Sequence, residues 1–134
     1  MYPEYVEDAE GDANLRSFMN WDNISSDAET KKVLEHWQKL GKFRRNHPAV
    51  GAGIHQMITG QPYYFYRSYQ QGEFKDLVVI GIGVHKGAKS IDVSKLFKNG
   101  VTLRDAYSGQ TSEVKSGRVT IDSPFDIVLL EKVN

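Results

Sequence analysis

Four histidines are the side chains of this sequence best suited to chemistry: His36, His47, His55 and His85. No two of them lie three or four residues apart on a predicted helix, and none shows the two-residue alternation of ligands on one strand. The chain contains no cysteine, which excludes thiol catalysis and thiolate metal sites. We therefore expect no metal centre. His36 and His47 are interpreted as solvated helix residues, and His55 and His85 as ordinary strand or turn residues.

Motifs for nucleophilic catalysis and for nucleotide binding are also missing. The sequence contains no Gly-x-Ser-x-Gly elbow of the kind that exposes a catalytic serine. Gly81, Gly83 and Gly87 superficially resemble a dinucleotide-binding loop, but the first two fall inside a predicted strand and no helix follows them. We expect no cofactor in this chain.

Carboxylates could carry out glycoside hydrolysis if two of them were held a defined distance apart in a cleft. Asp105, Asp122 and Asp126 all fall at predicted strand edges or turns. Aspartate in such places commonly accepts hydrogen bonds from neighbouring backbone N–H groups, so we expect that role for all three and no catalytic residue. The acidic run 7–12 lacks the oxygen spacing of a calcium loop and is interpreted as a solvated surface.

Aromatic residues are densest between Tyr63 and Tyr69 and could form a sugar-binding platform. Strand alternation would place Tyr63, Phe65 and Tyr69 on one face, and Tyr64 and Tyr66 on the other. One set is expected in the core. For the outward set, packing at an edge or interface is favoured over a ligand platform, because these residue types suit pleated surfaces in general.

Length and composition indicate one soluble globular domain. The chain has 134 residues, of which 25% are charged and 40% hydrophobic. Its formal net charge is zero, so no basic surplus favours nucleic acid as a partner. No apolar run approaches the roughly 20 residues that span a bilayer, and the N-terminus lacks the order of a signal peptide. Residues 1–24 differ from the rest, with six acidic side chains against Arg16 alone.

One long helix is predicted over 26–46. Ser26 and Glu29 have the spacing of a capping box, which would start the helix. Val33, Leu34, Trp37, Leu40 and Gly41 then follow at the spacing of one helical face, and the backbone restriction before Pro48 ends the helix. No second helix is expected beyond Pro48.

Short apolar or alternating runs follow, separated by glycine, asparagine and serine. They predict strands at 53–58, 63–69, 77–84, 89–92, 101–105, 111–114, 118–121 and 127–131. The run 77–84 is apolar on both faces and is predicted as the central strand. The expected fold is mainly β: an antiparallel Greek-key β-sandwich of about eight strands, preceded by one long α-helix and an irregular N-terminal segment. The apolar helix has few partners in its own half of the chain, which suggests that a larger structure is missing.

Two stretches carry a resemblance to a known family. Residues 11–22, GDANLRSFMNWD, are similar to the segment after the last barrel strand of alpha-amylase-type enzymes of glycoside hydrolase family 13. Residues 40–50, LGKFRRNHPAV, resemble that family's closing barrel helix and its step into the C-terminal domain. The later stretch 105–109, DAYSG, and the hairpin after it are similar to the C-terminal β-sandwich of the family.

The resemblance implies that residues 1–50 are the remnant of a catalytic TIM barrel (its last loop and last helix), and that residues 51–134 are the C-terminal β-sandwich domain. The catalytic carboxylates of the family would lie upstream, so this chain alone is expected to be inactive. The larger enzyme would act on α-glucans such as starch and maltooligosaccharides by the retaining route. Asp12 and Arg16 match the loop that borders sugar subsites in relatives and are the only substrate-binding residues carried over.

The resemblance also implies partners and a location. The main partner would be the missing barrel of the same polypeptide, with α-glucan bound through the larger enzyme and calcium, if any, in its missing part. A secreted, periplasmic or cell-surface enzyme is expected, with a cytoplasmic one left open. The bare apolar helix face predicts self-association of the isolated chain. Two alternatives stay open: a free-standing carbohydrate-binding β-sandwich that uses 63–69 and Trp21, and a small independent hydrolase.

Overall fold

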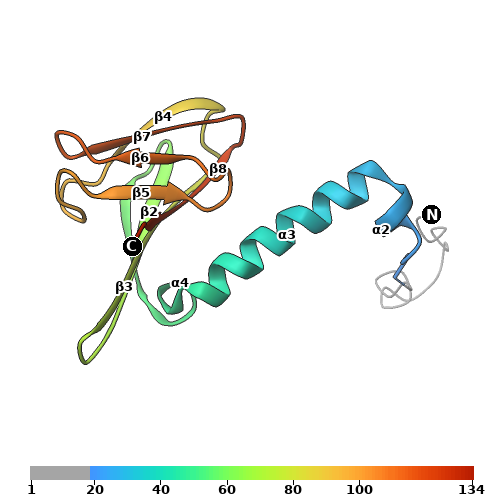
Figure 1. Ribbon diagram of the computed structural model, residues 1–134, viewed down its shortest axis with the longest axis horizontal. Coiled ribbons are helices and arrows are strands. Elements are labelled where there is room, and N and C mark those ends of the chain that lie inside the picture. Colours follow the sequence, from blue (N-terminus) through green and yellow to red (C-terminus); the bar gives the residue numbers. More distant parts are fainter. Residues whose placement is uncertain (1–18) are drawn as a thin grey trace, which may run out of the picture. The chain divides into compact units, whose positions relative to one another are not determined.

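The computed structural model describes residues 19–134 (Figure 1). The chain forms two compact units that divide after Gln38, within the longest helix, and each unit is described by itself. Residues 19–134 contain three helices: α2 (Asn23–Ser26), α3 (Ala28–Asn46) and α4 (Pro48–Ala52). The functional division near residue 50 stays a prediction.

With Ser26 as its N-cap, the predicted helix would begin at Asp27, but α3 begins one residue later, at Ala28. The carboxylate of Asp27 accepts the backbone N–H of Thr30 at 2.8 Å and its hydroxyl at 2.7 Å. Ser26 belongs to α2, and its hydroxyl donates to the carbonyl of Asp22 at 2.9 Å. The capping box at Ser26 and Glu29 is therefore wrong, because Asp27 does the capping. The predicted end at residue 46 is confirmed.

The apolar stripe of α3 is confirmed in part. Val33 and Trp37 are exposed, and Leu34 and Leu40 are half-buried. The buried residue of the helix is Phe43, which was not predicted to lie on the stripe. Phe43 follows Leu40 by three residues, so it shares a face with Leu40 in the unit that begins at Lys39.

The short helix α4 was missed by the sequence analysis. Pro48 occupies its first turn, where the fixed φ of proline suits a helix and its missing N–H is not needed. Five residues are too few to show helical periodicity, so the expectation of no second helix beyond Pro48 is wrong.

All eight predicted strands are present, with ends that differ by up to three residues. They are β1 (Ile54–Thr59), β2 (Tyr63–Gln71), β3 (Phe74–Ile82), β4 (Gly87–Asp92), β5 (Thr102–Asp105), β6 (Thr111–Glu113), β7 (Arg118–Ser123) and β8 (Ile127–Lys132). Every pairing between them is antiparallel. The mainly β class is confirmed.

The strands form two sheets (Figure 1). One sheet has six strands in the order β1-β2-β3-β8-β5-β6, and the other pairs β4 with β7. Strand β8 returns to lie beside β5, β5 pairs with β6, and an antiparallel bridge between Lys115 and Arg118 links β6 to β7. This neighbour order, β8-β5-β6-β7, is the predicted Greek key.

The six-stranded sheet has an apolar core on each face. The first core lies between the two sheets and includes Val79 of β3 and Ile121 of β7. The second core is on the other face and includes Val78 of β3 together with Phe43 and Ala49. Val78 and Val79 are adjacent and both have no exposed surface. The prediction of a central strand apolar on both faces is therefore confirmed.

Gly81 within β3 is required by packing. A Cβ at this position would lie 2.4 Å from the ring of Tyr64 on the neighbouring strand. The glycine therefore allows a large aromatic side chain to fill the first core, which explains Gly81 without a nucleotide. Gly83 lies just beyond β3 with a φ of 65°, a conformation that favours glycine.

Within residues 19–134, no helix combines the length and the apolar character needed to cross a bilayer.

Candidate functional site

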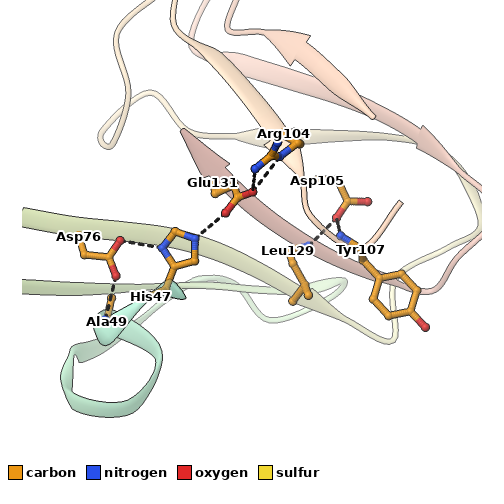
Figure 2. Close-up of polar contacts among 8 residues, drawn as sticks. All are labelled: His47, Ala49, Asp76, Arg104, Asp105, Tyr107, Leu129 and Glu131. Atoms are coloured by element: carbon orange, nitrogen blue, oxygen red, sulfur yellow. Dashed lines mark hydrogen bonds and ion pairs between the residues drawn. The ribbon is translucent and has the colours of Figure 1, made fainter. Parts of the chain in front are cut away.

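The most highly connected polar cluster of the described chain is centred on His47, between α3 and α4. Its Nδ1 lies 2.8 Å from Oδ1 of Asp76 on β3, and its Nε2 lies 2.6 Å from Oε2 of Glu131 on β8 (Figure 2). The His47 side chain is 14% exposed. The interpretation of His47 as a solvated helix residue is therefore wrong, because it links the end of α3 to two strands.

Both ring nitrogens of His47 take part in the cluster. A neutral imidazole carries one N–H and can donate to only one carboxylate, whereas the imidazolium donates from both nitrogens. Both ring nitrogens of His47 face carboxylate oxygens within hydrogen-bond distance. His47 therefore bridges the carboxylates of Asp76 and Glu131, which come from two different strands.

Glu131 joins the His47 contact to a second ion pair. Its Oε1 accepts hydrogen bonds from Nε and Nη2 of Arg104 on β5, at 2.8 and 2.5 Å (Figure 2). Burial by itself would raise the pKa of the Glu131 carboxyl, but the hydrogen bonds from His47 and Arg104 outweigh it and hold that pKa below its usual value. Glu131 is therefore ionised in the folded protein near neutral pH.

Asp76 and Arg67 hold α4 at its two ends. The second oxygen of Asp76 accepts the backbone N–H of Ala49, in the first turn, at 2.9 Å. From β2, Arg67 donates to the carbonyls of Ala49 and Gly53 at 2.8 and 2.7 Å. The Asp76 contact satisfies a backbone N–H that the start of a short helix leaves unpaired. The Arg67 contacts join α4 to β2, and together they fix the chain as it turns from α3 into β1.

Aromatic contacts fix the last turns of α3. The rings of Phe43 and His47 have centroids 4.7 Å apart. The ammonium of Lys39 lies 4.6 Å from the ring centre of Tyr107 and 5.2 Å from that of Phe125, which are cation–π distances. Residues 39–47 are thus bound to the sandwich by apolar, cation–π and ionic contacts together.

Asp105 fixes the turn beside this cluster and is fully buried. Its carboxylate accepts the N–H groups of Leu129 at 2.8 Å and Tyr107 at 3.1 Å (Figure 2), and it also binds the N–H and hydroxyl of Ser108. The predicted role of Asp105 is confirmed. Asp122 and Asp126 are exposed, and their predicted capping roles stay predictions.

The His47 cluster is suited to holding structure and not to glycoside hydrolysis. Each of its two carboxylates already accepts hydrogen bonds at both oxygens. The neighbouring hollow of about 310 Å³ includes Lys39, Lys42, Arg104 and Glu131 in its lining, so its charge is mainly basic, unlike the paired acids of a glycosidase cleft. Within residues 19–134, no three His, Cys, Asp or Glu side chains are arranged to hold a metal ion.

The remaining predicted residues do not converge on this cluster. Asp12 and Arg16 lie outside the described residues. The Nε2 of His55 is 3.0 Å from the Tyr63 hydroxyl, on the edge of the sheet, and the Nε2 of His85 is 2.6 Å from the carbonyl of Ala88. His36 lies edge-on to Trp37, with centroids 5.7 Å apart.

The aromatic stretch of β2 alternates as predicted, but both faces pack against apolar cores. Tyr64 and Tyr66 contact the first core, and Tyr63, Phe65 and Tyr69 contact the second. The expectation of an outward-facing set is wrong, because each face of the six-stranded sheet has its own cover.

Sequence reasoning missed four members of the cluster: Asp76, Glu131, Arg104 and Arg67. One signal was available. Asp76 precedes the apolar run of β3 and Glu131 follows that of β8, and the start of one strand lies beside the end of an antiparallel neighbour. The signal needs the β3–β8 pairing, which the sequence alone does not provide.

Comparison with known proteins places these features in a family context. No family model matches the chain. The periplasmic alpha-amylase of Escherichia coli (strain K12) is 42% identical to it over 65 residues, which is 48% of this chain and 9% of that protein. About half of the chain is thus similar to a part of an alpha-amylase. The resemblance read from the sequence is thereby confirmed.

Solved alpha-amylase-related structures share the fold. An Anoxybacillus alpha-amylase matches with a TM-score of 0.58 and 21% identity, over 78% of this chain and 23% of that one. AmyP, solved in complex with maltose, matches with a TM-score of 0.61 and 15% identity, over 95% of this chain and 28% of that one. The chain spans less than a third of the length of each of these three proteins, which agrees with a C-terminal domain of a family 13 type of enzyme.

Proposed function

We propose that the chain is the non-catalytic C-terminal part of an alpha-amylase-like glycoside hydrolase acting on α-glucans, and that its sandwich packs on the catalytic barrel and stabilises it. The observation that carries the proposal is the His47 cluster. It anchors the end of α3, the element that resembles the last barrel helix, to β3 and β8. A helix that belongs to the barrel and is bound this firmly to the sandwich couples the two parts.

The location and substrate of the larger enzyme follow from its relatives and are part of the proposal. The E. coli relative is named as periplasmic, which favours a secreted or periplasmic enzyme here. Asp12 and Arg16 are proposed to border its sugar subsites, and any calcium would bind in the part of the enzyme that lies outside this chain.

A chimeric enzyme tests the stabilising role. The E. coli periplasmic alpha-amylase would carry this chain in place of its own corresponding C-terminal region, and a truncated host would carry only residues 1–50 of this chain, so that it keeps the proposed last barrel helix and lacks the sandwich. We expect the chimera to keep more starch hydrolysis after heating than the truncated host. A chimera with His47→Ala is expected to lose most of that gain. Equal heat inactivation of chimera and truncated host would refute the proposal.

The isolated chain tests the two alternatives. All five aromatic residues of β2 contact a core, which disfavours that strand as a sugar platform. Trp21 is 71% exposed and would report a ligand. A shift in tryptophan emission at millimolar maltooligosaccharide would favour a free-standing binding module, and turnover of a chromogenic α-glucoside would favour an independent hydrolase. We expect neither.

A further inference from the structure

Strand β3 has one edge that is paired over only part of its length. On one side, β2 pairs with β3 from end to end. On the other side, β8 pairs only with residues 79–82 of β3, and beyond that point β8 pairs with β5 instead. Among residues 19–134, no strand pairs with residues 74–78 on this side. The tip of the β2–β3 hairpin also projects beyond the other strands (Figure 1).

A hollow of about 520 Å³ lies at this unpaired edge. Its lining includes four consecutive residues of β3: Phe74, Lys75, Asp76 and Leu77. Alternate residues of a strand point to opposite faces of the sheet, so a hollow that touches four in succession opens at the edge of the strand. Every second residue of an antiparallel strand directs its N–H and C=O groups away from its partner. In residues 74–78, these groups point away from β2 towards the hollow.

Two lysines give one side of the hollow a positive charge. Lys75 and Lys132 both belong to its lining and are exposed. Lys75 is four positions from Val79 and Lys132 is two from Leu130, so both project from the face of the first core. Among the described residues, neither ammonium forms a hydrogen bond or an ion pair.

The other side of the hollow presents an aromatic ring. Phe74 is 53% exposed, and it lies four positions from Val78, so it projects from the face of the second core. Asp76 projects from the same face, but its two oxygens already contact His47 and the N–H of Ala49. The charge that remains available to an occupant is therefore that of the two lysines.

We propose that the free edge of β3 binds an extended acidic peptide segment of a partner protein, which adds a strand to the six-stranded sheet. Main-chain hydrogen bonds to an unpaired strand edge give such a segment its affinity, and its alternate side chains give specificity. Acidic side chains on one face of the added strand would meet Lys75 and Lys132, and apolar ones on the other face would meet Phe74. A neutral glucan would leave both ammonium groups without a counter-charge. The proposal does not depend on the activity of the larger enzyme.

A labelled peptide tests the proposal directly. The probe is a fluorescein-labelled peptide of alternating aspartate and valine, titrated with the 134-residue chain and followed by fluorescence polarisation. We expect saturable binding, and a loss of affinity of about tenfold in the double variant Lys75→Glu/Lys132→Glu, because attraction becomes repulsion.

Lys86→Glu/Lys115→Glu is the matched control. Both lysines are exposed and lie outside the lining of the hollow, and this double variant changes the net charge by the same amount as the test variant. We expect it to bind the peptide with the affinity of the wild type.

Methylation of the peptide backbone separates strand pairing from charge attraction. Only alternate N–H groups of an added strand face β3. N-methylation of the aspartates and N-methylation of the valines should therefore differ in effect, so that one peptide loses binding and the other keeps it. Charge attraction alone would treat the two peptides alike.

Several results would overturn the proposal. They are equal binding of the two methylated peptides, equal binding of a peptide of alternating lysine and valine, and no saturable binding of the aspartate–valine peptide. If maltooligosaccharide bound instead, and bound more weakly to Lys75→Glu/Lys132→Glu, the hollow would be a glucan site and strand addition would be wrong.

Discussion

At the scale of single residues, His47 is central because one side chain makes several contacts at once. It lies within hydrogen-bond distance of two carboxylates and contacts Phe43 with its ring. Removing one member of a buried charge group leaves the others uncompensated, which costs more than the group contributes as a whole. The effect of a substitution at His47 should therefore exceed that of an exposed histidine.

His47→Gln is expected to lower the free energy of unfolding by about 3 kcal/mol, because the glutamine side chain cannot bridge both carboxylates as the ring does and leaves at least one of them short of a hydrogen-bond partner in a nearly buried place. His85→Gln is the control, since His85 is exposed, and a change within about 0.5 kcal/mol is expected for it. Urea unfolding of both variants measures the difference. Equal midpoints and slopes would show that the His47 contacts contribute nothing.

Glu131 predicts the dependence of stability on acid pH. Its pKa in the folded protein lies below the usual value of 4.5, so the unfolded chain binds the proton more tightly. The stabilisation is present above about pH 4.5 and is lost as the pH falls through the folded pKa. We expect the difference in unfolding free energy between wild type and Glu131→Gln to shrink between about pH 5 and pH 3. A constant difference over that range would contradict this assignment.

At the scale of elements, the sequence predicted the helix and strands that local patterns determine. It did not predict features that depend on contacts between residues far apart in the sequence. Eight strands followed from alternation and turn residues, and the central strand from its doubly apolar run. Helix α4 depends on Asp76 and Arg67, which lie 27 and 18 residues from Ala49, so no local pattern announces it. Lys89 is fully buried, with its ammonium bound to oxygens of Gly87 and Ser123, and nothing in its strand marks it as a core residue.

The same limit applies to what the sequence could predict of the candidate site. The backbone role of Asp105 follows from a general property of aspartate at turns, and it was predicted. The His47 cluster draws on α3, β3, β5 and β8, and the family resemblance marked only the His47-Pro48 step. Charged residues at strand ends become a cluster only when the pairing of β3 with β8 is known.

Gly53 tests the joint between α4 and β1. An added Cβ would lie 2.4 Å from the carbonyl oxygen of Ala49 and 2.7 Å from that of Ser68, both backbone atoms that cannot move aside alone. We expect Gly53→Ala to destabilise the protein by more than 2 kcal/mol, as strain in a tightly packed place does. Gly41→Ala on α3 meets nothing within 4 Å and should stabilise by roughly 0.5–1 kcal/mol. Thermal melts of both variants measure the two changes in stability, which should be opposite in sign. A loss of stability at both positions would contradict the packing argument.

At the scale of the whole molecule, exposed apolar side chains indicate that the chain is built to contact a larger body. Val33 and Trp37 on α3 are 57 and 65% exposed, and Ile82 at the end of β3 is 52% exposed. In a TIM-barrel enzyme, the apolar face of such a helix packs against the barrel strands. The isolated chain lacks that cover.

We predict that the isolated chain self-associates through the apolar face of α3, because an uncovered stripe is a liability in water. Trp37→Glu should shift the sedimentation profile towards monomer at micromolar concentration, whereas Ile54→Asp should leave it unchanged. A wild-type chain that stays monomeric at all micromolar concentrations would contradict self-association through α3.

The central claim is that the sandwich stabilises a catalytic barrel, and calorimetry of the chimeric amylase tests it most directly. The account predicts that barrel and sandwich unfold in one cooperative transition, at a higher temperature than the barrel of the truncated host. Two separate transitions, with the barrel unfolding at the same temperature as in the truncated host, would contradict it.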